Sequence, residues 1–172
     1  DFAQSLGIKM SEGDANLSLA LGGMDTGTNT FEMAQAFSAF ANGGEFKEAF
    51  AIKQIKDNKG KVVHENKGSK GKRVMEASTA SQMTDMMRRV VDEGTGKNAR
   101  ISRPVAGKTG TTNEQRSAWF IGFTPDLVCG VYIGFDNNDP MGRAMTGGGI
   151  AAPLWLDFMK TAVGETPKTK FA

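Results

Sequence analysis

Two neighbouring runs of apolar residues limit the folds open to this chain. Residues 118–123 and 127–135 are apolar at almost every position, and only the turn Thr124-Pro125-Asp126 separates them. A strand that is apolar at successive positions is covered on both faces, so each run predicts a strand inside a sheet. Because the connection is short, the two strands are expected to be antiparallel neighbours, and residues 104–112 are expected to add a third.

Three helices are expected to cover this sheet. The first begins after Asn29, a residue type that caps helices, and ends at Asn42-Gly43-Gly44. The others are expected over 78–93 and 151–163, and two short strands, 49–56 and 61–65, form a hairpin between the first two helices. This order predicts an α+β fold in which helices pack on an antiparallel sheet. A polar tail at 164–172 is expected to be frayed.

The net charge of +2 hides a strongly basic segment. Residues 53–73 carry eight basic and two acidic side chains, a local charge of +6, whereas the rest of the chain sums to −4. Such a segment can meet an anionic polymer or a membrane surface, but lysine-rich runs are most often solvated. We therefore expect a projecting hairpin over 49–65, a mobile loop over 66–73, and little contribution from either to binding.

The counts of cysteine and histidine exclude several chemistries. With only Cys129 and His64, the chain can form no intrachain disulfide and lacks the ligands for a Cys/His zinc site. We expect Cys129 to be a buried core thiol and His64 an exposed strand residue, and we expect no metal, cofactor or nucleic-acid partner. No apolar run reaches 18 residues, so nothing here is expected to span a bilayer. The chain begins at Asp1 rather than Met, as an excised fragment would.

The triplet Lys108-Thr109-Gly110 lies on the first expected strand of the sheet. A lysine here can place a positive charge beside a substrate carboxylate, and a threonine can add a hydroxyl to the same group. A glycine removes a side chain, so another backbone can lie against the strand edge as an added strand. The triplet alone is weak evidence, because short motifs match by chance.

The surroundings of the triplet make the pattern specific. The run 104–113 (PVAGKTGTTN) continues into 118–127 (AWFIGFTPDL), and further segments agree in order: 16–23 (NLSLALGG), 32–37 (EMAQAF), 40–44 (FANGG) and 151–155 (AAPLW). Together they resemble the transpeptidase domain of penicillin-binding proteins, particularly of class A, whose superfamily carries a K-T-G motif. The resemblance runs from about residue 5 to 163, collinearly. It implies the C-terminal portion of that domain over 1–163, with three strands of a five-stranded sheet.

The resemblance also implies a reaction and its partners. Such domains form a serine acyl-enzyme with the D-Ala-D-Ala end of a peptidoglycan stem peptide, and β-lactams acylate the same serine. Lys108, Thr109, Gly110 and Thr111 would bind the substrate, and the backbone N–H of Thr111 would be one donor of the oxyanion hole. Trp119 and Thr112 would lie at the edge of the groove. The parent protein would act on the extracytoplasmic face of the bacterial membrane, held by an anchor outside this chain.

Two further motifs of the family are missing. No S-x-N occurs, and the one S-x-x-K, at 69–72, falls in a Gly/Lys-rich loop rather than at the start of a buried helix. The resemblance therefore implies that the nucleophile is not in this chain, that the chain alone is inactive, and that the missing part or a second copy covers its sheet. Alternatives are a class B enzyme, a carboxypeptidase or a β-lactamase relative, and a non-catalytic penicillin-recognising or scaffold module.

Overall fold

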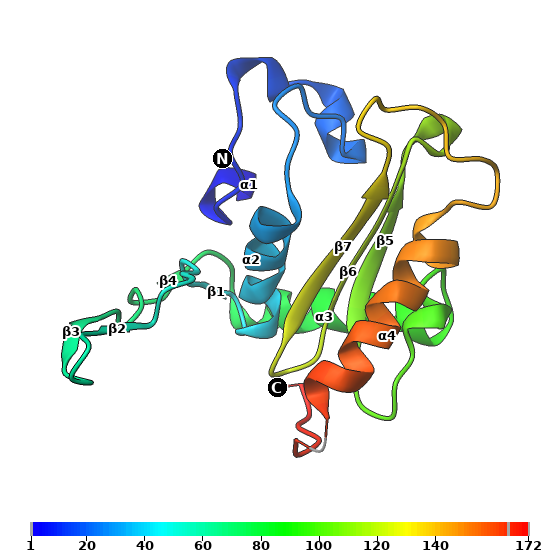
Figure 1. Ribbon diagram of the computed structural model, residues 1–172. Coiled ribbons are helices and arrows are strands. Elements are labelled where there is room, and N and C mark those ends of the chain that lie inside the picture. The colour runs from blue at the N-terminus through cyan, green and yellow to red at the C-terminus, as the bar shows by residue number, and fades with distance from the viewer. Residues whose placement is uncertain (1, 165, 172) are drawn as a thin grey trace.

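A computed structural model describes residues 2–164 and 166–171. Within these residues, four helices and seven strands are connected by loops and short helical turns. Figure 1 shows their arrangement. In chain order the helices and strands are α1 (Phe2–Ser5), α2 (Thr30–Ala41), β1 (Glu45–Phe46), β2 (Gln54–Lys56), β3 (Val62–Glu65), β4 (Lys72–Arg73), α3 (Ala77–Asp92), β5 (Ala106–Thr111), β6 (Ser117–Phe123), β7 (Val128–Gly134) and α4 (Ala152–Val163). A π-helical turn, Gly147–Ala151, leads into α4.

The sheet contains the three predicted strands in the order β5-β6-β7, all antiparallel. Its register pairs Lys108 with Ile121 and Gly110 with Trp119, and on the other side of β6 it pairs Trp119 with Tyr132. Because residues directly opposite in such a ladder share a face, Lys108, Gly110 and Trp119 lie on one face, while Thr109 and Thr111 lie on the other. The two apolar runs and their short turn therefore predicted this part of the fold correctly.

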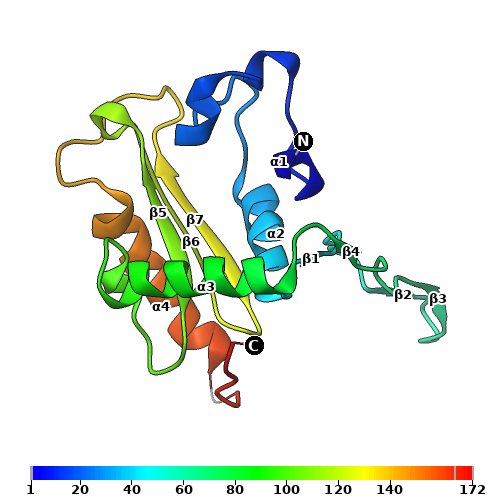
Figure 2. The ribbon, with the colours of Figure 1, turned by 180° about the vertical axis from the view of Figure 1, so that it is seen from behind.

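Helices cover the two faces of the sheet unequally (Figures 1 and 2). On one face, Phe37 of α2 packs edge-on against Phe123 of β6, and Met87 of α3 joins the same cluster. On the other face, the fully buried Trp155 of α4 packs edge-on against Phe120, with ring centres 5.4 Å apart. The Trp155 Nε1–H also donates to the carbonyls of Gly122 and Cys129, which ties α4 to β6 and β7.

Strand β7 differs from its prediction as a strand covered on both faces. In the described residues it has β6 as its only neighbour in the sheet, and its side chains are half-buried, with Tyr132 exposed. Central β6, in contrast, is buried along nearly its whole length. Helices α2 and α4 contact β7 without burying it fully, so the apolar pattern overstated the burial of this strand.

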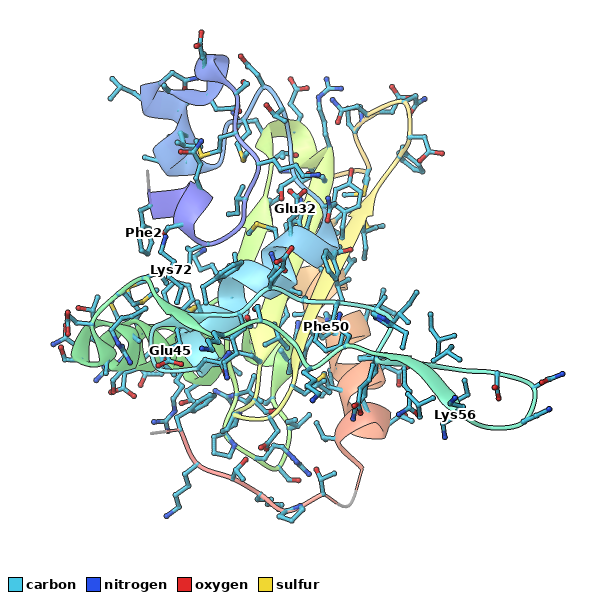
Figure 3. The ribbon with its side chains drawn as sticks, turned by 90° about the vertical axis from the view of Figure 1, so that its left-hand side faces the viewer. Phe2, Glu32, Glu45, Phe50, Lys56 and Lys72 are labelled. Carbon is cyan, nitrogen blue, oxygen red and sulfur yellow. The ribbon has the colours of Figure 1, made fainter. Side chains whose placement is uncertain are left out.

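The basic segment belongs to an arm, residues 45–73, that is longer than the predicted hairpin. Residues 49–53 are irregular, so the hairpin is reduced to β2 and β3, and β4 pairs with β1 at the base of the arm. The expected loop over 66–73 thus ends in a short paired strand. Figure 3 shows the arm extending away from the sheet, with Lys56 on its projecting hairpin. Every residue of β2 and β3, including His64, is exposed, as expected for a solvated hairpin.

The described residues of the C-terminal tail are docked rather than frayed. Phe171 packs edge-on against Phe123, with ring centres 5.6 Å apart. Thr169 hydrogen-bonds to Asp126, and the Arg103 guanidinium donates to the Thr166 hydroxyl and to the Gly164 carbonyl. The tail was predicted to fray because most of its residues are polar. That prediction was wrong because one aromatic residue, Phe171, packs against the core.

Candidate functional site

The Lys-Thr-Gly strand β5 lies at an edge of the sheet, and within the described residues no strand pairs with its outer side. The N–H of Thr112 donates across the ladder to the Ser117 carbonyl (3.1 Å). Since backbone groups alternate in direction along a strand, the N–H of Thr111 points the opposite way, toward the free edge. The same alternation turns the Thr109 carbonyl to that edge.

The ammonium group of Lys108 is held at this edge. Its Nζ donates to the Thr109 carbonyl at 2.8 Å, and no salt bridge joins it to a carboxylate within the described ranges. An ammonium group has three donors, so two remain for a ligand. The strand edge therefore presents an uncompensated positive charge beside an outward-facing backbone N–H, an arrangement suited to an anion.

Gly110 and Trp119 form the neighbouring part of this surface. A Cβ atom on Gly110 would stand 3.2 Å from the Trp119 Cβ, a tight contact, so the glycine gives the Trp119 side chain room beside the strand. Trp119 also packs on Tyr132, with ring centres 4.8 Å apart. The glycine thus makes room for an aromatic side chain as well as leaving the strand edge bare.

A cavity of about 410 Å³ lies against the Lys108 face of the strand. One wall is formed by residues 108–112 and by Trp119 and Ile121 of β6. The opposite wall comes from Met33 and Phe37 of α2 and from residues of the N-terminal segment. All the sequence-predicted substrate-binding residues, including the groove-edge residues Trp119 and Thr112, therefore line one cavity whose far side is apolar.

A buried carboxylate shapes the N-terminal wall of the cavity. Asp14 is fully buried and accepts hydrogen bonds from the Ser11 N–H (2.7 Å), the Thr26 hydroxyl (2.8 Å) and the Asp25 N–H (2.5 Å). These bonds, led by the one from Ser11, hold the pKa of Asp14 far below its usual range, because each stabilises the charged form. Asp14 thereby closes the loop that carries Leu19 and Leu21 over the site.

The opposite face of β5 rests on the glycine-rich turn before α4. The Gly147 N–H donates to the Thr111 hydroxyl at 3.0 Å, and Asn98 Nδ2 donates to the Gly148 carbonyl at 2.9 Å. The Thr109 hydroxyl lies 2.6 Å from that of Thr95. Reasoning from sequence missed Thr95, Asn98 and Gly147. The sequence signals at these positions were the segment Gly94-Thr95-Gly96, which belongs to the family resemblance, and the glycine-rich turn at 146–149.

Replacing Gly147 by alanine should disturb the strand directly. An added Cβ would lie 2.4 Å from the Trp119 carbonyl oxygen and 2.6 Å from that of Gly110, both of them backbone atoms that cannot turn aside. Overpacking of this kind typically costs about 1–3 kcal/mol. We expect Gly147→Ala to lower the melting temperature of the protein by several degrees, measured by thermal denaturation. Gly43→Ala, where no atom lies within 4 Å, is a partial control, because its positive φ adds strain but no overlap. Equal melting temperatures for Gly147→Ala and wild type would contradict the packing.

The turn after the strand carries unusual backbone angles. Glu114 and Gln115 both have positive φ, 59° and 50°, a region that non-glycine residues rarely occupy. Arg116 compensates by donating to Glu114 Oε2 (2.6 and 3.1 Å) and to the Asn138 carbonyl (2.7 Å). The Glu114–Arg116 pair thus stabilises this turn and connects it to the loop that contains Asn138.

Other candidate groups lie apart from the cavity. Ser69, of the only S-x-x-K pattern, sits in the basic arm, where its hydroxyl accepts from the Glu48 N–H at 3.0 Å. Cys129 is half-buried rather than fully buried, and desolvation raises its pKa. In the ranges that the structure covers, no three His, Cys, Asp or Glu side chains group as a metal site would require, and no helix is long and apolar enough to cross a membrane.

The fold places the chain among the serine β-lactamase-like transpeptidase domains, as a partial domain. The solved structure of penicillin-binding protein 1A from Haemophilus influenzae superposes with a TM-score of 0.87 at 29% sequence identity, over 98% of this chain and 31% of that one. Residues 5–160 match the family model of the penicillin binding protein transpeptidase domain. The chain belongs to this family, as its sequence predicted.

Two relatives by sequence carry the same name as that solved structure. Penicillin-binding protein 1A of Neisseria lactamica is 40% identical over 173 residues, which cover 96% of this chain. The protein of that name from Aquifex aeolicus is 39% identical over 155 residues, covering 90% of this chain. In both cases the matched part is 21% of the relative, so this chain spans about a fifth of their length.

Proposed function

We propose that this chain is the C-terminal part of a peptidoglycan D,D-transpeptidase domain and supplies its carboxylate-binding wall. The observation that carries the proposal is the ammonium group of Lys108, held at a free strand edge beside a cavity and without a carboxylate partner in the described residues. A stem peptide ending in D-Ala-D-Ala, or a β-lactam, carries the carboxylate that such a group attracts. Family membership supports this substrate class.

Within this proposal, each residue of the strand has one role. Lys108 attracts the terminal carboxylate, and the Thr109 hydroxyl donates to the same group. The outward N–H of Thr111 stabilises negative charge on the carbonyl oxygen when the serine attacks, and a second donor comes from beside the nucleophile. Gly110 leaves the edge open for the peptide backbone, and Trp119 forms the groove wall. The lysine works as a fixed charge and undergoes no covalent change.

The nucleophile is proposed to come from the part of the protein that precedes this chain. Ser69 lies in the exposed arm, which extends away from the cavity (Figure 3). The preceding part would also cover the open side of the site, where Leu17 and Leu21 are 96% and 92% exposed. Exposed apolar side chains that lie close together in this way mark a surface on which another part of a protein packs. We place the whole protein on the extracytoplasmic face of the bacterial membrane, as its substrate requires.

Covalent labelling of the full-length protein tests the proposal. A fluorescent penicillin should acylate one serine, and mass spectrometry of the digested adduct should place that serine outside residues 1–172. Competition by an unlabelled β-lactam is the control for specific labelling. If the full-length protein takes up no label, the proposed enzyme function is wrong, and the result favours the alternative of a non-catalytic penicillin-recognising or scaffold module.

A further inference from the structure

The hydroxyl of Thr109 already has a partner in the protein. Thr95 lies in the turn that ends α3, and its Oγ1 is 2.6 Å from the Oγ1 of Thr109. The two residues are 14 positions apart. The Thr109 side chain alternates with that of Lys108 along β5, but both residues lie at the free edge of the strand, and Thr109 is among the residues that line the cavity. Any role for the Thr109 hydroxyl in binding a carboxylate therefore depends on how the two threonines share their protons.

A hydroxyl has one proton to donate and two lone pairs to accept with. If Thr109 donates to Thr95, its proton is used and it can offer a carboxylate only lone pairs, which repel. If Thr95 donates to Thr109, the Thr109 proton is free for the substrate. An ionised carboxylate accepts hydrogen bonds and never donates them, so only the second arrangement binds it.

We propose that Thr95 is a positioning residue: its hydroxyl donates to Thr109 Oγ1 and leaves the Thr109 proton directed at the substrate carboxylate. The proposal rests on the proposed function, because it concerns the same anion site. Thr95 itself does not touch the substrate. Its effect is to preset a donor that would otherwise rotate freely, which reduces the entropy lost when the carboxylate binds.

The surroundings of Thr95 hold it in place for this role. The turn is closed on α3 by hydrogen bonds from Gly94 N–H to the Arg89 carbonyl (3.0 Å) and from Gly96 N–H to the Val90 carbonyl (2.9 Å). On its other side, the Thr95 carbonyl packs so closely on Gly148 that a Cβ there would lie 2.2 Å from it. The turn is thus packed between a helix and the Gly147–Ala151 turn, which keeps the backbone of Thr95 beside the strand.

The matched pair Thr95→Val and Thr95→Ser tests this role in the full-length protein. Valine keeps the shape of threonine and removes the hydroxyl, whereas serine keeps the hydroxyl. We expect Thr95→Val to lower the second-order rate of acylation by a fluorescent penicillin roughly fivefold to tenfold, the scale of one hydrogen bond. Thr95→Ser should stay within about twofold of wild type, on the same reasoning. If Thr95→Val does not fold, Thr95→Ala provides the same comparison.

A double-mutant cycle separates positioning from a structural role. In a Thr109→Val background there is no hydroxyl to orient, so adding Thr95→Val should change the acylation rate by less than about twofold. A loss that persists in this background, or that follows a lowered melting temperature, would show that Thr95 only holds the turn. An unchanged rate for Thr95→Val would also overturn the proposal. Failure of the proposed function looks different, because the wild-type protein itself would then not be acylated.

Discussion

Lys108→Ala should lower the rate at which penicillin acylates the full-length protein by roughly 10²-fold, the scale expected when a charge-assisted contact to the substrate is lost. The side chain makes one hydrogen bond within the described structure, to the Thr109 carbonyl, and no salt bridge there. Its removal should therefore cost binding and acylation far more than folding. Stopped-flow or gel-based measurement of the second-order acylation rate, beside a thermal melt, gives both quantities.

Lys56→Ala is the matched control for this change. It removes the same charge from an exposed strand of the basic arm, away from the cavity (Figure 3). We expect its acylation rate to stay within about twofold of wild type, because an isolated surface charge is screened by solvent. If the Lys108→Ala protein has the melting temperature and the acylation rate of wild type, the proposal that this strand binds the carboxylate is wrong. An equally large effect of Lys56→Ala would show that the basic arm takes part in binding.

The purified 172-residue chain should form no covalent adduct with a fluorescent penicillin, although it carries the Lys-Thr-Gly strand. Acylation needs a nucleophile with an adjacent base, and one oxyanion donor without its partner stabilises little. Within the described structure Ser69, the only serine in an S-x-x-K pattern, bonds to the Glu48 N–H in the arm. In-gel fluorescence with the full-length protein as positive control measures the difference.

The folded state of the isolated chain must be checked in the same experiment. The buried Trp155 packs between α4 and the sheet, so its fluorescence spectrum and a thermal melt report whether that core has formed. A folded, unlabelled chain is the expected result. Stoichiometric labelling, mapped by mass spectrometry to any serine in the 172 residues, would show that the nucleophile lies within this chain and that the active site has been misplaced.

Sequence patterns predicted the elements whose signals are local. The cap at Asn29 accepts from the Glu32 N–H at 2.9 Å and begins α2 as expected. The continuous apolar runs and the short turn at 124–126 predicted β6 and β7 as antiparallel neighbours. These features depend on residues within a few positions of one another, so a single sequence contains the information.

The mistaken predictions share a cause. Residues 49–53 have strand-like composition but form no strand. Strand β4 was missed because its partner β1 lies far earlier in the chain, with Arg73 opposite Glu45, 28 positions before it, in a segment with no strand signal. The tail was predicted to fray because its polar residues outnumber Phe171, the one that docks. A strand needs a partner strand and a docked tail needs a surface to pack on, and both can be distant in the sequence. The composition of the segment itself does not indicate whether such a partner exists.

The sequence alone determined the family and the three-stranded sheet, since a short motif within a long collinear pattern identifies them, and it is the source of the proposal that the Lys-Thr-Gly strand binds the substrate. Only the tertiary structure decided what surrounds that strand. The contacts that set the site, Thr95 with Thr109, Gly147 with Thr111 and Asn98 with Gly148, join residues 14, 36 and 50 positions apart. No helical or strand period relates such residues. They meet because the backbones of β5, the α3 turn and the glycine-rich turn pack together in the folded chain, and packing depends on all three at once.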